Sequence, residues 1–527
     1  MVRTGRYLLA AALAVGMLGI DVAVAAPADV LTYHNDLART GQNLLETTLT
    51  PANVSPSTFG RLFTRVVDGF VYAQPLIVTG LAIGGGTRDV VFIATENDTV
   101  YAFDAAGAVT KPLWRRRLIV AKTGGRPVSS REVGCDDLVP KIGVTSTPVV
   151  DRASGTLYVV AKTKERGRGN FMQRLHALDL ATGAEKLGGP VAITASVPGS
   201  GDGSVGDMIA FDPLRQHQRP ALALVNGVVY VSSASHCDVG PYHGWILGYD
   251  AATLTRVSAF VTTPAGGLGG VWQSGGAPAA DATGNLYVET GNGTFDAQNG
   301  GNDYGDTLLK LATTSGLAVA DYFTPFNEGD LDAVDKDFGS AAPLILPDQP
   351  GSHPHVVIAS GKEGTIYVID RDDMGHFRAG SDTQIVQSVR SAVGSTFGMP
   401  AYWNGGLFYS GVDDVLKAFA VSNGLVSTTP VAQSADVFGF PGATPSISAN
   451  GTSNGIVWTL QTDGYAERKP AILHAYAAPD VSHSLYASDQ NGRRDVAGKA
   501  VKFAVPTVAN GRVYVGGQNR LTVYGLR

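Results

Sequence analysis

The hydrophobic and polar positions of the chain repeat one pattern eight times. Each unit opens with a proline and a few apolar residues, turns at Gly or Asn, and continues as an aromatic and β-branched run such as "GTLYVVAKT" or "GNLYVETG". Alternating runs of this kind, bounded by turn residues, predict short β-strands. The prolines that open the units are Pro75, Pro148, Pro220, Pro278, Pro343, Pro400, Pro445 and Pro506.

Such units cannot bury both faces alone, so they must stack on one another. Radial stacking of four-stranded antiparallel blades gives a β-propeller, which leaves only short, protected edges. We therefore predict an all-β, eight-bladed β-propeller over residues 26–527. An open array or a pair of β-sandwiches is the alternative. The last unit has fewer strands, so "VLTYHNDLART" (Val30 to Thr40) is expected to supply the missing N-terminal edge strand and close the ring.

Composition agrees with many short strands and tight turns. The 527 residues include 66 Gly and 27 Pro, and only 16% are charged. The net charge is −6, and no run of Lys or Arg follows the first few residues. This balance argues against nucleic acid as a partner.

The first 25 residues have the features of a secretory signal peptide. Arg3 and Arg6 precede an apolar stretch from Leu8 to Ile20, and Ala23-Val24-Ala25 offers a cleavage site. The stretch is too short for a comfortable membrane span, although an uncleaved anchor helix is the alternative. We expect cleavage near Ala25 and a soluble mature protein, periplasmic or secreted, with no transmembrane segment.

Export changes how the two cysteines are interpreted. Cys135 and Cys237 form an even count in an oxidising compartment, so a disulfide is possible, although they lie 102 positions apart. We predict that they pair and link two neighbouring blades. Neither cysteine begins a C-x-x-C-H motif, so the sequence encodes no covalent haem.

Trp272 and Asn292 form the first candidate site, in "GGVWQSGGAPAADATGNLYVETGNGTF". A Trp among glycines could stack on a flat ligand. The Asn292 amide oxygen, between two glycines, is the kind of hard ligand that Ca²⁺ prefers. The alternative is a core Trp and an ordinary turn Asn.

A second candidate is the loop "SHCDVGPYHGW", in which Asp238 could bind a cation. His236 and His243 with Cys237 also suggest zinc, but no further Cys/His cluster accompanies them. Solvent-exposed loop histidines are the preferred interpretation.

The remaining candidates follow later in the chain. In "DAVDKDFGSAAPLIL", one carboxylate before a strand could act as a general base, whereas Asp332 and Asp335 are interpreted as solvated. Lys362, at a glycine-flanked turn, could present its ammonium group to an anionic or carbonyl ligand, or could be an ordinary hairpin lysine.

In chain order these four segments resemble the quinoprotein alcohol dehydrogenases, which use pyrroloquinoline quinone (PQQ) and are eight-bladed propellers exported to the periplasm. "LTYHNDLARTGQNLLETTLTPANV" and the D-x-x-T-G blade ends also look like that family. The resemblance implies PQQ and Ca²⁺ as cofactors. It implies that Trp272, Lys362 and Cys135 bind the cofactor, that Asp238, Asn292 and Asp337 bind the metal, and that Asp337 is the catalytic base.

The chain also departs from the family pattern. A single cysteine in "GCDD" replaces the adjacent Cys-Cys pair, so a vicinal disulfide cannot form. The arginine expected shortly afterwards is not evident, although Lys141 is near, and Tyr72 replaces a glutamate of the first blade. Gly339 stands where lanthanide-using relatives have an additional acid, which favours Ca²⁺.

The function implied by the resemblance is oxidation of an alcohol or sugar hydroxyl, with a separate electron acceptor such as a soluble cytochrome c. Two alternatives stay open: a propeller that has lost the cofactor and serves as a periplasmic binding or assembly module, and a propeller enzyme acting on carbohydrate. Fold alone does not separate them, because propellers host many functions.

Overall fold

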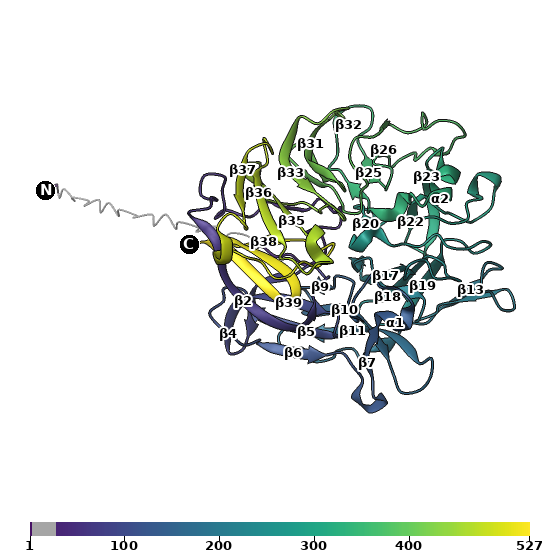
Figure 1. Cartoon of the computed structure of the whole chain (residues 1–527), viewed down its shortest axis with the longest axis horizontal. Helices are drawn as coiled ribbons and strands as arrows, with labels where there is room; N and C mark the ends of the chain where they lie inside the picture. The colour runs from purple at the N-terminus through teal and green to yellow at the C-terminus, as the bar shows by residue number, and fades with distance from the viewer. Residues whose placement is uncertain (3–27) are drawn as a thin grey trace.

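The computed structural model describes residues 1–2 and 28–527. Over this part of the chain, eight small antiparallel sheets form a ring around a central axis (Figure 1). The predicted eight-bladed β-propeller is confirmed. The expected signal peptide falls almost wholly on residues 3–27, outside the described residues. No helix in the described part is long and apolar enough to cross a membrane.

Blades are numbered here from the first complete sheet along the chain, and the first four each contain four consecutive main strands. Blade 1 consists of β3 (Leu76–Ile83), β4 (Gly86–Thr95), β5 (Thr99–Asp104) and β6 (Trp114–Arg117), and blade 2 of β9 (Val149–Asp151), β10 (Thr156–Lys164), β11 (Phe171–Asp179) and β12 (Val191–Ala192). Blade 3 consists of β16 (Ala223–Val225), β17 (Val228–Ser235), β18 (Trp245–Asp250) and β19 (Arg256–Val261), and blade 4 of β20 (Ala279–Ala280), β21 (Leu286–Glu289), β22 (Leu308–Ala312) and β23 (Ala318–Thr324).

The second half of the ring repeats this arrangement, except that blade 8 combines the two ends of the chain. Blade 5 consists of β24 (Leu344–Ile345), β25 (Val356–Ser360), β26 (Ile366–Asp370) and β28 (Gln387–Val389), and blade 6 of β29 (Ala401–Trp403), β30 (Gly406–Ser410), β31 (Asp414–Ser422) and β33 (Ala432–Phe438). Blade 7 consists of β34 (Ser446–Asn450), β35 (Ser453–Gln461), β36 (Ile472–Ala477) and β37 (Ser484–Ala487), and blade 8 of β38 (Thr507–Ala509), β39 (Arg512–Leu526) and β2 (Phe59–Phe70).

Short additional elements decorate the blades. Most extend a blade sheet, and one pair forms a separate hairpin. These strands are β1 (Gln42–Asn43), β7 (Arg126–Ser129), β8 (Lys141–Ile142), β13 (Ser196–Pro198), β14 (Met208–Ala210), β15 (Gln216–His217), β27 (His376–Phe377) and β32 (Leu425–Val426), and the helices are α1 (Ser130–Val133) and α2 (Glu328–Ala333).

The repeated prolines mark where the innermost strands begin. In seven blades the proline directly precedes the first strand, for example Pro75 before β3 and Pro400 before β29, and only Pro220 lies a few residues earlier. A proline lacks an N–H group, so it is best tolerated at the start of a strand. The core lies between blades: one cluster packs Val91 of blade 1 against Leu157 of blade 2. Strands such as β5 are therefore buried on both faces.

The ring is closed by an N-terminal strand, but not by the segment expected from the sequence. Strand β2 pairs with β39 in antiparallel register from Phe59↔Leu526 to Phe70↔Gln518, and Figure 1 shows them side by side at the two ends of the colour scale. Val30 to Thr40 contains no strand in the described structure beyond a single bridge from Val30 to Ile77. That expectation was wrong, because the turn-rich "YHNDLART" sequence cannot run extended.

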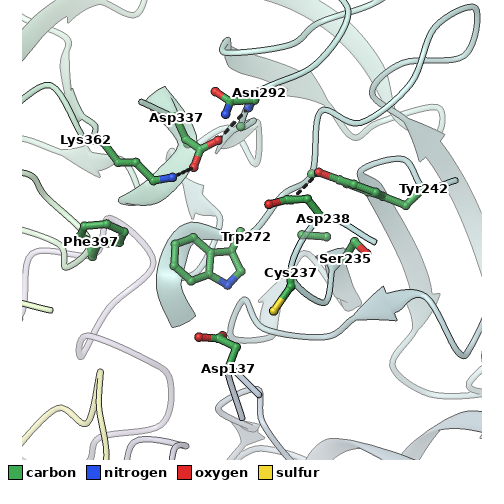
Figure 2. Close-up of a pocket in the computed structure, with 14 residues that line it drawn as sticks. Asp137, Ser235, Cys237, Asp238, Tyr242, Trp272, Asn292, Asp337, Lys362 and Phe397 are labelled. Carbon is green, nitrogen blue, oxygen red and sulfur yellow. Dashed lines mark hydrogen bonds and ion pairs between the residues drawn. The ribbon is translucent and has the colours of Figure 1, made fainter. Parts of the chain in front are cut away.

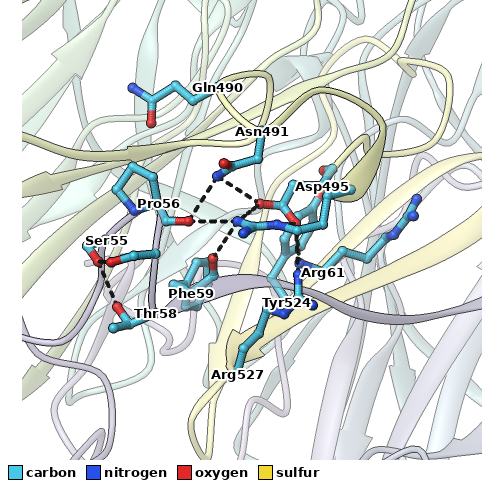
Figure 3. Close-up of polar contacts among 12 residues, drawn as sticks. Ser55, Pro56, Thr58, Phe59, Arg61, Gln490, Asn491, Asp495, Tyr524 and Arg527 are labelled. Carbon is cyan, nitrogen blue, oxygen red and sulfur yellow. Dashed lines mark hydrogen bonds and ion pairs between the residues drawn. The ribbon is translucent and has the colours of Figure 1, made fainter.

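A cluster of hydrogen bonds around Asp495, called the polar lock below, stabilises this closure (Figure 3). The buried carboxylate of Asp495 accepts a hydrogen bond from the backbone N–H of Arg61 at 3.1 Å. The hydroxyl of Tyr524 donates to the carbonyl of Asp495 at 2.8 Å. The Arg494 guanidinium and the Asn491 amide donate to the carbonyl of Pro56 at 2.7 and 3.0 Å. The lock thus joins both sides of the ring's seam.

Residues 30–41 lie instead along the innermost strands, and we call them the central segment. Its carbonyl oxygens accept hydrogen bonds of 2.7 to 2.9 Å from the second residue of the first strand in six blades. The donors are the backbone N–H groups of Ile77, Val150, Ala280, Ile345, Tyr402 and Ile447. The central segment therefore provides hydrogen-bond acceptors for inward-facing backbone N–H groups of blades 1, 2, 4, 5, 6 and 7.

Candidate functional site

The expected site residues occupy equivalent places in neighbouring blades. Asp238, Asn292 and Lys362 follow the second strands β17, β21 and β25, whereas Trp272 and Asp337 precede the first strands β20 and β24. The first two strands of each blade are antiparallel. The start of one and the end of the other therefore lie at the same edge, and all five residues meet at one end of the central axis.

These five residues line a single cavity of about 180 Å³. Figure 2 shows the Trp272 indole at its centre, between the Asp337–Lys362 pair on one side and Cys237 and Asp137 on the other. Residues from blades 3, 4 and 5, chosen from the sequence as separate candidates, thus belong to one site.

Asp337 and Lys362 form an ion pair through Oδ2 and Nζ. The other carboxylate oxygen of Asp337 accepts the backbone N–H of Asn292 at 3.1 Å. Burial lowers the pKa of Lys362, but the charges of Asp337 and Asp335 outweigh it, so the net shift is upward. Lys362 is therefore a cation held in place by its contacts with Asp337 and Asp335.

The carboxylate of Asp238 also lines the cavity, and its pKa is raised. Burial raises its pKa, and the nearby charge of Asp337 adds to this, while a hydrogen bond of 2.7 Å from the Tyr242 hydroxyl opposes it. The backbone of Asp238 has φ of 51° and that of Cys237 48°. This left-handed turn is tolerated by Asp better than by most residues.

Asn292 offers an unused oxygen. Its Oδ1 atom is buried and has no hydrogen-bond partner in the described structure, while its Nδ2 group donates to Asp335 Oδ1 at 3.1 Å. Asp335 also lies 2.8 Å from Lys362 Nζ. The carboxylate of Asp335 is exposed, as expected, but it also contacts two residues of the site.

Aromatic rings support Trp272 from the side. The rings of Phe397 and Phe503 meet the indole nearly edge-on, with centroid distances of 6.0 and 5.7 Å and interplanar angles of 86° and 87°. Edge-to-face packing of this kind restricts the rotation of a ring. The indole is therefore held in one orientation.

Cys135 and Cys237 are joined in a disulfide, with their Cα atoms 5.7 Å apart. The bond ties the β7–β8 extension of blade 2 to the loop after β17 of blade 3. Cys237 lines the cavity, whereas Cys135 is buried behind it and does not. Cys135 is therefore connected to the cavity only through its disulfide bond to Cys237.

Glycines allow the blade ends to approach one another here. A Cβ atom on Gly339 would lie 2.4 Å from the backbone carbon of Thr290, and one on Gly291 would lie 3.1 Å from Asp337 Oδ1. Both glycines line the cavity. A side chain at Gly339 would force blades 4 and 5 apart and separate Asn292 from Asp337.

The two loop histidines are buried, contrary to the preferred interpretation as exposed residues. His243 bonds through its ring nitrogens to Thr263 and to the carbonyl of Asp202 at 3.0 and 2.8 Å. His236 Nε2 lies 2.8 Å from the ammonium group of Lys162. Neither histidine belongs to a cluster of three potential metal-binding His, Cys, Asp or Glu side chains within the described residues.

The sequence did not identify several residues of the cavity. Tyr242 lies four positions after Asp238, and its role is evident only in the folded structure, from its hydrogen bond to Asp238. Asp137 lines the cavity and pairs with Lys502, a residue 365 positions away. Lys141, by contrast, is exposed and does not line the cavity.

The side chains present fit a calcium ion and a flat anionic cofactor. Asp238, Asp337 and the unpartnered Oδ1 of Asn292 are oxygen donors of the kind that Ca²⁺ prefers. Three oxygens are fewer than the six to eight ligands of Ca²⁺, so the bound cofactor and water would complete the shell. Trp272 provides an aromatic surface, and Lys362 a cation beside it.

Comparison with known proteins supports the fold. The chain matches a quinohemoprotein alcohol dehydrogenase from Comamonas testosteroni with a TM-score of 0.61 and 16% identity, covering 96% of this chain and 81% of that one. A quinohemoprotein alcohol dehydrogenase from Pseudomonas putida HK5 gives 0.60 and 15%, over 95% and 80%. A europium-containing methanol dehydrogenase gives 0.58 and 13%, over 95% and 98%.

No family model matches the chain, and no curated protein matches it. At the identities found, the similarity to solved structures concerns the fold. The chain therefore has the eight-bladed propeller fold of these dehydrogenases.

Proposed function

We propose that this protein is a quinoprotein dehydrogenase that oxidises the hydroxyl group of an alcohol or sugar with PQQ and Ca²⁺. The observation that carries the proposal is the convergence of Trp272, Asp238, Asn292, Asp337 and Lys362 on one cavity. The fold shared with alcohol and methanol dehydrogenases supports it.

In this proposal each side chain has a defined task. Trp272 packs its face against the cofactor, and Asp238 and Asn292 hold the metal. Lys362, fixed by Asp337, contributes a positive charge beside the cofactor's oxygens. When bound, PQQ accepts the hydride from the carbinol carbon, and Ca²⁺ acts on it as a Lewis acid.

Asp337 is the proposed general base. One carboxylate oxygen faces Lys362 Nζ and the other the Asn292 N–H group. These contacts orient the carboxylate, so that it can take the hydroxyl proton as the hydride leaves. Binding substrate and cofactor in fixed positions also keeps the reacting atoms close together and aligned for the reaction.

Electrons then pass to a separate acceptor, for which a soluble cytochrome c is the proposed class, because the chain has no C-x-x-C-H motif. The signal peptide expected from residues 1–25 supports a proposed activity in the periplasm or outside the cell.

Reconstitution tests the proposal. The purified protein, mixed with PQQ and Ca²⁺, should give a bound-quinone absorption spectrum and reduce an artificial dye with alcohols or sugars. Trp272→Ala should weaken PQQ binding with or without Ca²⁺, because it removes the stacking surface. Asn292→Ala should mainly raise the Ca²⁺ concentration required, because it removes one oxygen ligand of several.

Two outcomes would contradict these roles. Equal, calcium-independent effects of both substitutions would show that Asn292 is only a turn residue. Absence of a bound-quinone spectrum for the wild-type protein would instead favour the cofactor-free binding module.

A further inference from the structure

A groove leads away from the candidate cavity across blades 8 and 7. It consists of three hollows with volumes of about 760, 690 and 430 Å³. Adjoining hollows share lining residues, so they follow one another along the surface. The shared residues are Asp137 between the cavity and the first hollow, Phe70, Pro140, Arg468 and Gln518 between the first and second, and Pro470 and Val496 between the second and third.

The lining of this groove is strongly basic. Seven Lys and Arg residues line it against three aspartates, Asp136, Asp137 and Asp489, and Asp137 is already paired with Lys502. This contrasts with the whole chain, whose net charge is −6. Six of the basic residues form no salt bridge with any described residue: Arg131, Arg468, Lys469, Arg493, Lys499 and Arg520.

Unpaired cations concentrated along one concave surface attract an extended anionic ligand. Aromatic side chains accompany them: Tyr72 and Tyr465 line the first hollow, and Phe70 lines the first two. Rings of this kind give apolar contact to the C–H faces of sugars, while the Tyr hydroxyls and Gln518 can hydrogen-bond to sugar hydroxyls.

We propose that the groove binds an acidic polysaccharide, a hydroxyl-rich chain that carries carboxylates, and directs its end into the cavity beside Asp137. Oxidation of a hydroxyl at that end rests on the function proposed above; binding in the groove does not. A concave path between blades suits a single extended chain, whereas a globular acidic protein would require a broad, flat patch.

Tetragalacturonate is the probe, and maltotetraose, which has no carboxylates, is its neutral counterpart. Titration calorimetry with the full chain, without PQQ or Ca²⁺, should show binding of tetragalacturonate that weakens as NaCl rises from about 50 to 300 mM, because salt screens the charges. The triple variant Arg468→Gln, Lys499→Gln, Arg520→Gln should bind it about tenfold more weakly or worse, since several charge contacts are lost.

A matched control triple changes the same charge elsewhere: Lys111→Gln, Arg168→Gln, Arg378→Gln. These residues are exposed and line none of the three hollows. The control should bind within about twofold of wild type, since its charges lie away from the groove. Both triples should retain the wild-type melting temperature, which excludes misfolding as the cause.

Four results would overturn the inference: no binding of tetragalacturonate, equal binding of maltotetraose, equal weakening by the control triple, or tighter binding of a single-stranded oligonucleotide in competition. The dye assay with a small alcohol separates this inference from the proposed function. If the wild-type protein does not bind tetragalacturonate but reduces the dye, only the groove proposal is contradicted. If it binds tetragalacturonate but does not reduce the dye, only the dehydrogenase proposal is contradicted.

Discussion

At the scale of single residues, the arrangement of the site depends on Lys362, which is shared between two carboxylates. Its ammonium group contacts the carboxylates of both Asp335 and Asp337, and Asp335 also accepts the amide of Asn292. One cation therefore connects the expected base to the expected metal ligand. A change of charge at Asp337 acts on the orientation of Lys362 as well as on proton transfer.

Asp337→Asn separates these two effects. The amide keeps the shape of the carboxylate but cannot take the hydroxyl proton, so turnover of the PQQ-loaded enzyme should fall by about 10²–10⁴. Cofactor binding should weaken far less, because Trp272 is untouched and Lys362 still has Asp335 as a partner. Steady-state dye reduction and a PQQ titration measure the two quantities.

The control for this substitution is Asp332→Asn, since Asp335 contacts the site. Asp332 is exposed on α2 and forms no salt bridge with any described residue that carries a positive charge. It should keep wild-type turnover. If Asp337→Asn turned over as fast as wild type, another group would be the base.

At the scale of elements, strands β10 and β15 hold a buried polar cluster with His236, at the start of the loop that carries Asp238. Lys162 of β10 donates to the carbonyls of Leu214 and Gln216 at 2.8 and 3.0 Å and lies 2.8 Å from His236 Nε2. The ring of His236 stacks on that of His217 with centroids 4.2 Å apart. His236 immediately precedes Cys237 and Asp238, so the cluster anchors one wall of the cavity.

This cluster makes stability depend on pH. Burial lowers the pKa of Lys162 from 10.5 to about 7. Between these values the unfolded chain binds a proton that the folded chain lacks, so the free energy of unfolding rises with pH, by at most about 1.4 kcal/mol per pH unit. Below pH 7 both states are protonated, and this contribution is constant.

Lys162→Met should remove that part of the pH dependence. Urea unfolding at pH 7, 8 and 9 should show the stability difference between wild type and variant growing with pH. Lys111→Met, at an exposed position, should keep the wild-type slope. Parallel slopes for wild type and Lys162→Met would show that Lys162 keeps its ordinary pKa.

At the scale of the whole molecule, the repeat and its closure by an N-terminal strand were predictable, but the segment that supplies this strand was not. Prolines such as Pro278 and Pro445 mark the start of each inner strand, because a missing N–H group is tolerated there, and eight such marks predict eight blades. The closing strand β2 shows no such mark. Its pairing with β39 joins residues 448 to 467 positions apart, which local pattern cannot specify.

The site was predictable to a similar extent. Trp272, Asn292, Asp337 and Lys362 stand at strand ends that the repeat itself locates, so their convergence follows from the fold. Contacts between distant loops do not follow from it. The pairing of Asp137 with Lys502 and the basic groove depend on how blades 2, 7 and 8 meet across the ring.

The central segment gives the last prediction, because it touches most blades at once. Arg39 within it is completely buried. Its guanidinium donates to the carbonyl of Pro278 at 3.0 Å, beside blade 4, and to the carbonyls of Tyr33 and Asp36 at 2.8 and 3.0 Å. Arg39→Met would leave the carbonyls of Pro278 and Tyr33 without this donor, whereas that of Asp36 keeps the backbone N–H of residue 39 at 3.3 Å.

Each buried carbonyl without a donor costs about 1–3 kcal/mol, so the loss of two donors should lower the free energy of unfolding by about 2 kcal/mol or more. Urea denaturation followed by Trp fluorescence measures this change. Arg378→Met, at an exposed position, should change stability by no more than about 0.5 kcal/mol. Equal stability of the two variants would mean that the buried guanidinium of Arg39 adds nothing to the stability that the backbone hydrogen bonds of the central segment already provide.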